Sequence, residues 1–274
     1  MTDTPHSPYS FPPLGVRRIG RVNWLGVWTL YKKEVMRFVN VWLQTLVAPM
    51  VTSLLFFTVF SLAIGAGRPA VHGIPFVEFL APGLIMMAVL QNAFANTASS
   101  ILISKVQGNI VDSLMPPLSA GELTFAYAMG GATRGLVVAG ATGVILAFFV
   151  DLSPASWVAA LFFAASASLL MSLVGILAGV WSDKFDHMAA VTNFVIMPLT
   201  FLSGTFYSVE RLPEAFQIIS SFNPFFYMID GFRAGIVGYA DSPLWQGAAI
   251  ITAINVVLWA LSHRVFATGW RLKA

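Results

Sequence analysis

The sequence predicts an all-α membrane protein with six transmembrane helices. Only 10% of its 274 residues are charged, whereas a soluble domain normally carries about 25%. Hydrophobic residues make up 57% of the chain, and the mean hydropathy is +0.78. Several apolar stretches also reach the roughly 20 residues that a helix needs to cross a bilayer. A chain with so few polar side chains cannot cover itself in water, so a membrane is the expected environment.

The amino-terminal region has two parts. Residues 1–20 are rich in Pro, Ser and Thr and lack the pattern of a cleaved signal peptide, so we expect a disordered cytoplasmic tail. Residues 21–40 predict an amphipathic helix, because its apolar and aromatic side chains recur at helical spacing on one face. These residues are Trp24, Trp28, Tyr31, Val35 and Phe38. Such a face suits the headgroup zone and favours an interfacial helix. A cytosolic helix packed on another subunit is the alternative.

Six apolar stretches define a transmembrane domain over residues 41–262. They cover residues 41–64, 79–103, 123–150, 156–181, 188–207 and 244–262. The connection before the last stretch is too apolar for a plain soluble loop, and Pro213 and Pro224 can each begin a short helix. We expect two re-entrant half-helices there, shielded by protein. Residues 263–274 are expected to form a cytoplasmic tail.

The basic residues predict the orientation. With six spans both termini share one side, and 11 of the 15 Lys and Arg residues fall on that side. Three fall on the other side, and Arg134 lies inside the third span. Cytoplasmic loops carry the excess of Lys and Arg, so both termini are predicted to be cytoplasmic.

Small and irregular residues suggest how the spans pack. The third span has Gly131, Gly135, Ala139 and Gly143 four residues apart, and the fourth has Gly175 and Gly179. This spacing lets helices approach closely, which favours packing within the chain and leaves homodimer contact as the alternative. Pro49 and Pro198 should kink the first and fifth spans or free backbone carbonyls.

The second span is unusually polar for a membrane helix. Asn92, Asn96 and Ser100 share one of its faces. Polar groups at that depth either bond a neighbouring helix or line a wet path. Both alternatives stay open, and we name these three residues as candidates for a translocation pathway.

The sequence lacks the motifs of the common enzymes. It has no cysteine, no phosphate-binding GxxxxGK[ST] loop and no HExxH, so we expect no cofactor, no metal site and no catalytic residues. The basic residues lie at membrane flanks, which argues against nucleic acid. The fragment Asp230-Gly-Phe-Arg233 leaves a lipid-modifying enzyme as one alternative, and a secondary carrier is another. A proton-coupled carrier would need a buried chain of Asp, Glu or His, which is missing here.

The stretch LSGTFYSVERLPEAFQIISSFNPFFYMIDGFR, from Leu202 onward, resembles the signature of the permease subunits of type-2 ABC transporters. The residues that fall at the signature's spacings are Gly204, Leu212, Pro213, Asn223, Pro224, Tyr227 and Arg233. The cytoplasmic segment 109–119 also resembles the family's first cytoplasmic loop, with Asp112 where a Glu is common. The resemblance covers residues 20 to 270 and is closest to small permeases of the bacterial inner membrane.

The resemblance implies a division of labour between chains. In such exporters two permease copies pair, here as a homodimer, within the cell membrane, and separate ATPase subunits dock below them. The docking residues would be Asp112, Ser113, Leu114, Pro116 and Pro117, beside Lys32, Lys33, Glu34 and Arg37. The conduit would form between the two copies, and export is the expected direction. ATP hydrolysis would belong to the partner, so this chain would not itself be an enzyme.

Overall fold

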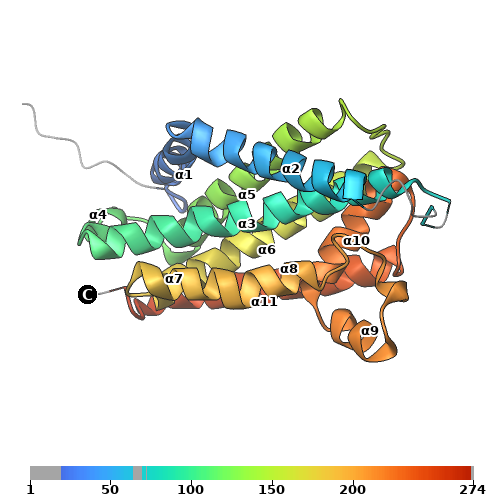
Figure 1. The fold of residues 1–274 in the computed structure, drawn as a ribbon. Helices are drawn as coiled ribbons and strands as arrows, with labels where there is room; N and C mark the ends of the chain where they lie inside the picture. Colours follow the sequence, from blue (N-terminus) through green and yellow to red (C-terminus); the bar gives the residue numbers. More distant parts are fainter. Residues whose placement is uncertain (1–19, 64–69, 72, 273–274) are drawn as a thin grey trace, which may run out of the picture.

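The fold was analysed in a computed structural model that describes residues 20–63, 70, 71 and 73–272. The expected disordered tail therefore lies outside the described residues, apart from Gly20. The regular secondary structure of the described residues is helical, apart from one isolated bridge between Val71 and Ile74. Its long helices run side by side along one bundle (Figure 1).

The helices follow one another with short connections. The α-helices are α1 (Trp24–Val39), α2 (Ala48–Ala63), α3 (Phe76–Val106), α4 (Ile110–Leu114), α5 (Ala120–Leu146), α6 (Trp157–Trp181), α7 (Phe185–Val191), α8 (Met197–Phe201), α9 (Glu214–Ser221), α10 (Pro224–Val237) and α11 (Leu244–Thr268). The other turns are the π-helices η1 (Leu43–Val47) and η3 (Thr192–Ile196) and the 3₁₀-helix η4 (Val209–Arg211).

Five helices of the described chain are long and apolar enough to cross a membrane. They are Leu43–Ala63, Phe76–Val106, Ala120–Leu146, Trp157–Trp181 and Leu244–Thr268. Each overlaps one predicted stretch, and α11 continues six residues beyond the expected end at 262. The remaining prediction, 188–207, corresponds to a shorter helical run over Phe185–Phe201. That run ends before Gly204, which adopts φ +73°, a left-handed conformation that suits glycine.

A π-helical turn precedes each of the two prolines that were expected to disturb a span. Before Pro49, the amide of Ala48 donates to the carbonyl of Leu43. Before Pro198, the amide of Met197 donates to the carbonyl of Thr192. Proline cannot donate a backbone hydrogen bond, so the regular ladder is interrupted near it, and a wider turn is one way to accommodate the break. Both spans therefore depart from a regular α-helix at these points.

The polar helix α3 lies at the centre of the bundle. In its most apolar stretch 83% of the residues are buried, against 11% for the Leu43–Ala63 helix. Small residues allow α6 to approach α3 closely, because a Cβ added to Gly175 would lie 2.1 Å from Oγ1 of Thr97. Likewise, a Cβ added to Gly131 of α5 would lie 2.3 Å from Oγ of Ser172 on α6. These glycines therefore serve packing within the chain, which was the favoured expectation.

The two ends of the bundle carry different elements. Helices α1, α4 and α7 lie at the end of the bundle where α11 finishes, and α9 and α10 lie at the opposite end (Figure 1). We call the first the α1–α4 end and the second the α9–α10 end. The α1–α4 end contains both segments that the family resemblance associates with an ATPase.

Candidate functional site

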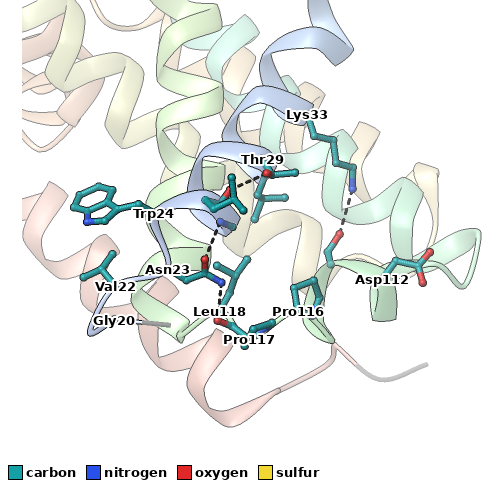
Figure 2. Close-up of a pocket in the computed structure, with 14 residues that line it drawn as sticks. Gly20, Val22, Asn23, Trp24, Thr29, Lys33, Asp112, Pro116, Pro117 and Leu118 are labelled. Carbon is teal, nitrogen blue, oxygen red and sulfur yellow. Dashed lines mark hydrogen bonds between the residues drawn. The ribbon is translucent and has the colours of Figure 1, made fainter. Parts of the chain in front are cut away.

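A groove of about 540 Å³ opens at the α1–α4 end, between the start of α1 and the connection from α3 to α5. Figure 2 shows this groove with its lining side chains. Its lining includes Asn23, Thr29 and Lys33 on one side and Asp112, Pro116, Pro117 and Leu118 on the other. We call it the α1–α4 groove. It brings together two segments that lie about eighty residues apart in sequence.

The amino-terminal side of the groove is held by Asn23 and Glu122. Asn23 caps α1, since its side-chain oxygen accepts from the amide of Gly26 at 3.0 Å. Its side-chain amide donates to the carbonyl of Pro117 at 3.2 Å, and its backbone amide donates to Glu122. Glu122 also forms a capping box with Ser119 at the start of α5. One carboxylate thus joins the beginnings of two helices.

Neither Asn23 nor Glu122 was among the predicted site residues. The capping box itself is readable in the sequence, because Ser119 stands three residues before Glu122 at the start of a helix. The contact from Glu122 to Asn23 spans 99 residues and has no local signal.

The other side of the groove is formed by α4 and the residues that follow it. Within this single helical turn Ile110 and Ser113 are buried, whereas Val111 and Asp112 are exposed. The Nζ atom of Lys33 donates to Oγ of Ser113 at 3.2 Å and so connects α1 with α4 (Figure 2). The groove therefore joins Lys33 and Ser113, two residues that the sequence had placed in the same docking surface.

Of the remaining predicted docking residues, Lys32, Pro116 and Pro117 are exposed at the α1–α4 end, and Leu114 is half-buried. Glu34 and Arg37 are placed differently from the others. Glu34 is fully buried, and its Oε1 accepts a hydrogen bond from Oγ of Ser100 at 2.7 Å. Arg37 is half-buried and lies 3.5 Å from the other carboxylate oxygen of Glu34.

Glu34 is therefore not part of the surface at the α1–α4 end in this structure, and its role in ATPase coupling stays a prediction. The reason is the close approach of α1 to α5 at Gly130, where an added Cβ would lie 2.6 Å from Cβ of Glu34. The face that α1 buries consists of Val27, Leu30, Glu34 and Phe38, while Trp24 and Trp28 remain exposed. Arg37 also contacts α3, because it donates to Oγ of Ser99 at 3.0 Å.

The three polar residues of α3 all bond charged side chains from neighbouring helices. Ser100 bonds Glu34, as described above, and Oδ1 of Asn96 accepts from Arg37 at 3.1 Å. Oδ1 of Asn92 accepts from Nη2 of Arg134 on α5 at 2.8 Å. Hydrogen bonding between helices, one of the two alternatives for this face, is thus present. A role of these residues in a translocation pathway stays a prediction.

The signature residues lie at the α9–α10 end, where their side chains stabilise the backbone. Arg233 is 1% exposed, and its Nη2 donates to the carbonyl of Gly204 at 2.6 Å. Its Nε donates to the carbonyl of Phe79 at 3.3 Å, and its guanidinium carbon lies 3.9 Å above the ring of Phe79. A Cβ on Gly83 would lie 2.3 Å from the carbonyl oxygen of Thr205. Arg233 therefore fastens α10 to α3 and to the turn after α8.

The other signature residues shape the two helices of this end. Asn223 caps α10, and Pro224 occupies its first turn. The side-chain amide of Asn223 also donates to the carbonyl of Leu199 at 2.8 Å. The hydroxyl of Tyr227 donates to the carbonyl of Ser221 at 2.9 Å. Leu212 and Pro213 connect η4 to α9.

The fragment that had suggested a lipid enzyme also has a structural role. Asp230 is 1% exposed and accepts from the amide of Asp241 at 2.7 Å. It also accepts from the amide and the hydroxyl of Ser242, at 2.9 and 2.7 Å. Within the described residues, no group of His, Asp and Glu side chains is arranged to hold a metal ion.

Comparison with known proteins agrees with the resemblance noted in the sequence. Residues 26–237 match the family ABC-2 type transporter. The inner membrane transport permease YadH of Escherichia coli K12 is 39% identical over 245 residues, covering 88% of this chain and 96% of YadH. Nodulation protein J of Rhizobium leguminosarum bv. viciae is 26% identical, covering 80% of this chain and 84% of that protein. The chain therefore belongs to the ABC-2 type transporter family.

Proposed function

We propose that this chain is the membrane-spanning permease subunit of an ATP-driven exporter, and that a separate ATPase subunit docks in the α1–α4 groove. Two copies of the permease pair, and the translocation pathway forms between them. The chain crosses the cell inner membrane six times, with the run from Phe185 to Phe201 as the fifth crossing and both termini in the cytoplasm. The name of the Escherichia coli relative, an inner membrane transport permease, supports this location.

The α1–α4 groove is the observation that carries this proposal. A pump needs a source of energy, and the sequence offers no phosphate-binding loop of its own. The groove presents Lys33 and Asp112, one cation and one anion, beside apolar walls formed by Pro116 and Leu118. A partner surface that combines an apolar side chain with charges of both signs would be complementary to it.

Movement of the groove would reach the centre of the bundle through Glu34. This residue lies on the same helix as Lys33, and its hydrogen bond to Ser100 links α1 to α3. Closure of the ATPases would therefore move α1 and α3 together. Asn92, Asn96 and Ser100 would experience that movement first, which supports their place near the pathway.

At the opposite end, α9 and α10 would form the re-entrant half-helices. Helix α9 exposes Phe216 and Ile219, and Phe222 is exposed just after it; these side chains are poorly suited to water and would be accommodated by the outer leaflet. Helix α10 is almost entirely buried, so its backbone would be shielded by protein, as membrane depth requires.

Gentle affinity purification of the tagged protein from its native membrane tests the proposal. We expect an ATPase subunit to be recovered in about equal amount, and to be lost in Asp112→Arg. Asp151→Arg is the matched control, because Asp151 is an exposed aspartate on the connection between α5 and α6 rather than in the groove. Recovery of no ATPase from a membrane that contains one, or equal recovery with both variants, would argue against docking at this groove.

A further inference from the structure

A second cavity, of about 220 Å³, opens at the surface between α2 and α3. Five of its lining residues carry uncharged polar side chains: Gln44, Thr52, Ser53, Gln91 and Asn92. Apolar side chains, including Phe56 and Met87, form the rest of its wall. None of the described residues that line it is ionisable. The π turn η1 and Pro49 border this cavity, where the first span departs from a regular helix.

The polar side chains of this cavity differ in whether their atoms already have hydrogen-bond partners. Both polar atoms of the Asn92 side chain have a partner, because its oxygen accepts from Arg134 and its amide donates to the carbonyl of Ala88 at 2.9 Å. Gln91 is different, since its Nε2 is buried and makes no hydrogen bond within the described part of the chain. A buried donor without a partner costs free energy that a ligand oxygen would recover.

The surroundings argue that the cavity does not face lipid. Hydrocarbon cannot satisfy hydroxyl and amide groups at this depth, so such a cavity is stable only beside water, protein or a polar ligand. The face of α3 that carries Asn96 and Ser100 is closed by Arg37 and Glu34. Of the three candidate pathway residues, only Asn92 lines this opening.

We propose that the α2–α3 cavity is a substrate-contact site for an uncharged polar group that carries hydroxyl or amide oxygens and is attached to an apolar chain. Gln91 donates a hydrogen bond to a ligand oxygen, Thr52 and Ser53 complete the polar side, and the apolar wall holds the chain. No counter-charge lines the cavity among the described residues, and Arg134 is engaged with Asn92 rather than lining it, which disfavours charged headgroups. This inference rests on the proposed transport function and specifies the class of substrate.

The cysteine-free sequence makes a direct test possible. Thr52→Cys and its matched control Thr58→Cys place one thiol each on α2, at two threonines that are both exposed in the single chain. Only Thr52 lines the cavity, although Thr58 lies nearer the end of the helix. The permease alone, in lipid nanodiscs, is treated with a charged, water-soluble methanethiosulfonate. We expect Thr52→Cys to react at least about tenfold faster, because thiolate chemistry needs a wet site.

Protection from labelling then tests the class of ligand. Octyl glucoside, octyl sulfate and octyltrimethylammonium share one chain and differ in headgroup charge, and each is added below its solubilising concentration. We expect octyl glucoside alone to slow the labelling of Thr52→Cys. A second substitution, Gln91→Leu, should weaken that protection about fivefold through loss of one hydrogen bond, while the variant elutes as a folded protein.

Equal labelling at Thr52 and Thr58, or equal protection by all three surfactants, would overturn the inference. Because no ATPase is present, this result is independent of whether a partner subunit is recovered in the purification above. If the ATPase is recovered but the two cysteines are labelled equally, or the three surfactants protect equally, the proposed transport function still stands. Only the α2–α3 site is then rejected.

Discussion

Glu34 of α1 and Ser100 of α3 form a buried hydrogen bond of 2.7 Å between the amino-terminal helix and the central helix of the bundle. They lie 66 residues apart in sequence. Arg37 lies beside the pair, 3.5 Å from the second oxygen of Glu34. The pair connects the helix that borders the groove at the α1–α4 end with the polar face of α3.

Replacement of Glu34 should therefore loosen α1. Glu34→Ala leaves Arg37 and Ser100 without their shared partner, and removal of one member of such a pair costs about 2 kcal/mol. We expect a lower thermal midpoint for the detergent-solubilised protein. Glu34→Gln keeps an acceptor for Ser100 and should lose less. The exposed Lys32→Ala is the control, and a decrease for Lys32→Ala as large as that for Glu34→Ala would contradict this assignment.

Gly175 should tolerate no side chain. Even the methyl group of Gly175→Ala would lie 2.1 Å from Oγ1 of Thr97 and 2.6 Å from the carbonyl of Phe94. Because this backbone cannot move aside easily, overpacking should cost about 1–3 kcal/mol in the free energy of unfolding. Gly140→Ala, in open space on α5, should be neutral or stabilising by up to about 1 kcal/mol. Thermal unfolding of the two variants distinguishes these outcomes, and equal stability would argue against the close α3–α6 contact.

The sequence was sufficient to predict most of this architecture, because long apolar stretches and proline positions are local properties. The burial of Glu34 was not predictable in the same way. The aromatic stripe of α1 suggested a face for the headgroup zone, but Val27 and Leu30 form a second stripe at equally helical spacing, which shares Phe38 with the first. Which stripe is buried depends on the small surface at Gly130, almost one hundred residues away.

The candidate site could also be predicted only in part, because its contacts join residues that are far apart in the sequence. Family resemblance located Lys33 and Ser113, and the structure brings them into contact. Hydropathy could not locate the α2–α3 cavity, since its polar residues come from two separate helices. The helical run that corresponds to the fifth predicted span ends at Phe201 rather than at 207, since hydropathy does not register the positive φ of Gly204.

Arg233 should not be replaceable by lysine. Its guanidinium reaches two carbonyls, those of Phe79 and Gly204, and stacks on the ring of Phe79. A lysine ammonium lacks this planar geometry, so Arg233→Lys should lower the free energy of unfolding by about 2 kcal/mol. The exposed Arg211→Lys is the control. A thermal midpoint for Arg233→Lys that matches this control would show that the guanidinium does not hold the α9–α10 end together.

Acid should weaken the contact between the connection after α6 and the end of α3. A hydrogen bond from Lys105, at 3.2 Å, and its positive charge hold the pKa of Asp183 below its ordinary value. A carboxyl whose pKa is lower in the folded state contributes stability above its unfolded pKa and loses it as the pH falls through the folded pKa.

Asp183→Asn should therefore reduce the loss of thermal stability between pH 7 and about pH 3, since the ordinary pKa of Asp is near 4. The effect should be small, because the carboxylate is exposed and screened by solvent. Thermal midpoints measured across this range in 0.1 M and 1 M salt provide the test. An acid dependence identical to that of the wild type would exclude a contribution from Asp183.

Site-specific cross-linking tests the central claim, that an ATPase docks at the α1–α4 end, most directly. A photoreactive maleimide is attached to a single cysteine at Asp112 or Met115 in the otherwise cysteine-free chain, and to one at Asp151 as the control. Illumination of the native membrane should join the ATPase to the probes at 112 and 115, and not to the probe at 151. An ATPase adduct at 151, or none at 112 and 115 from a complex that still co-purifies, would contradict the proposed docking site.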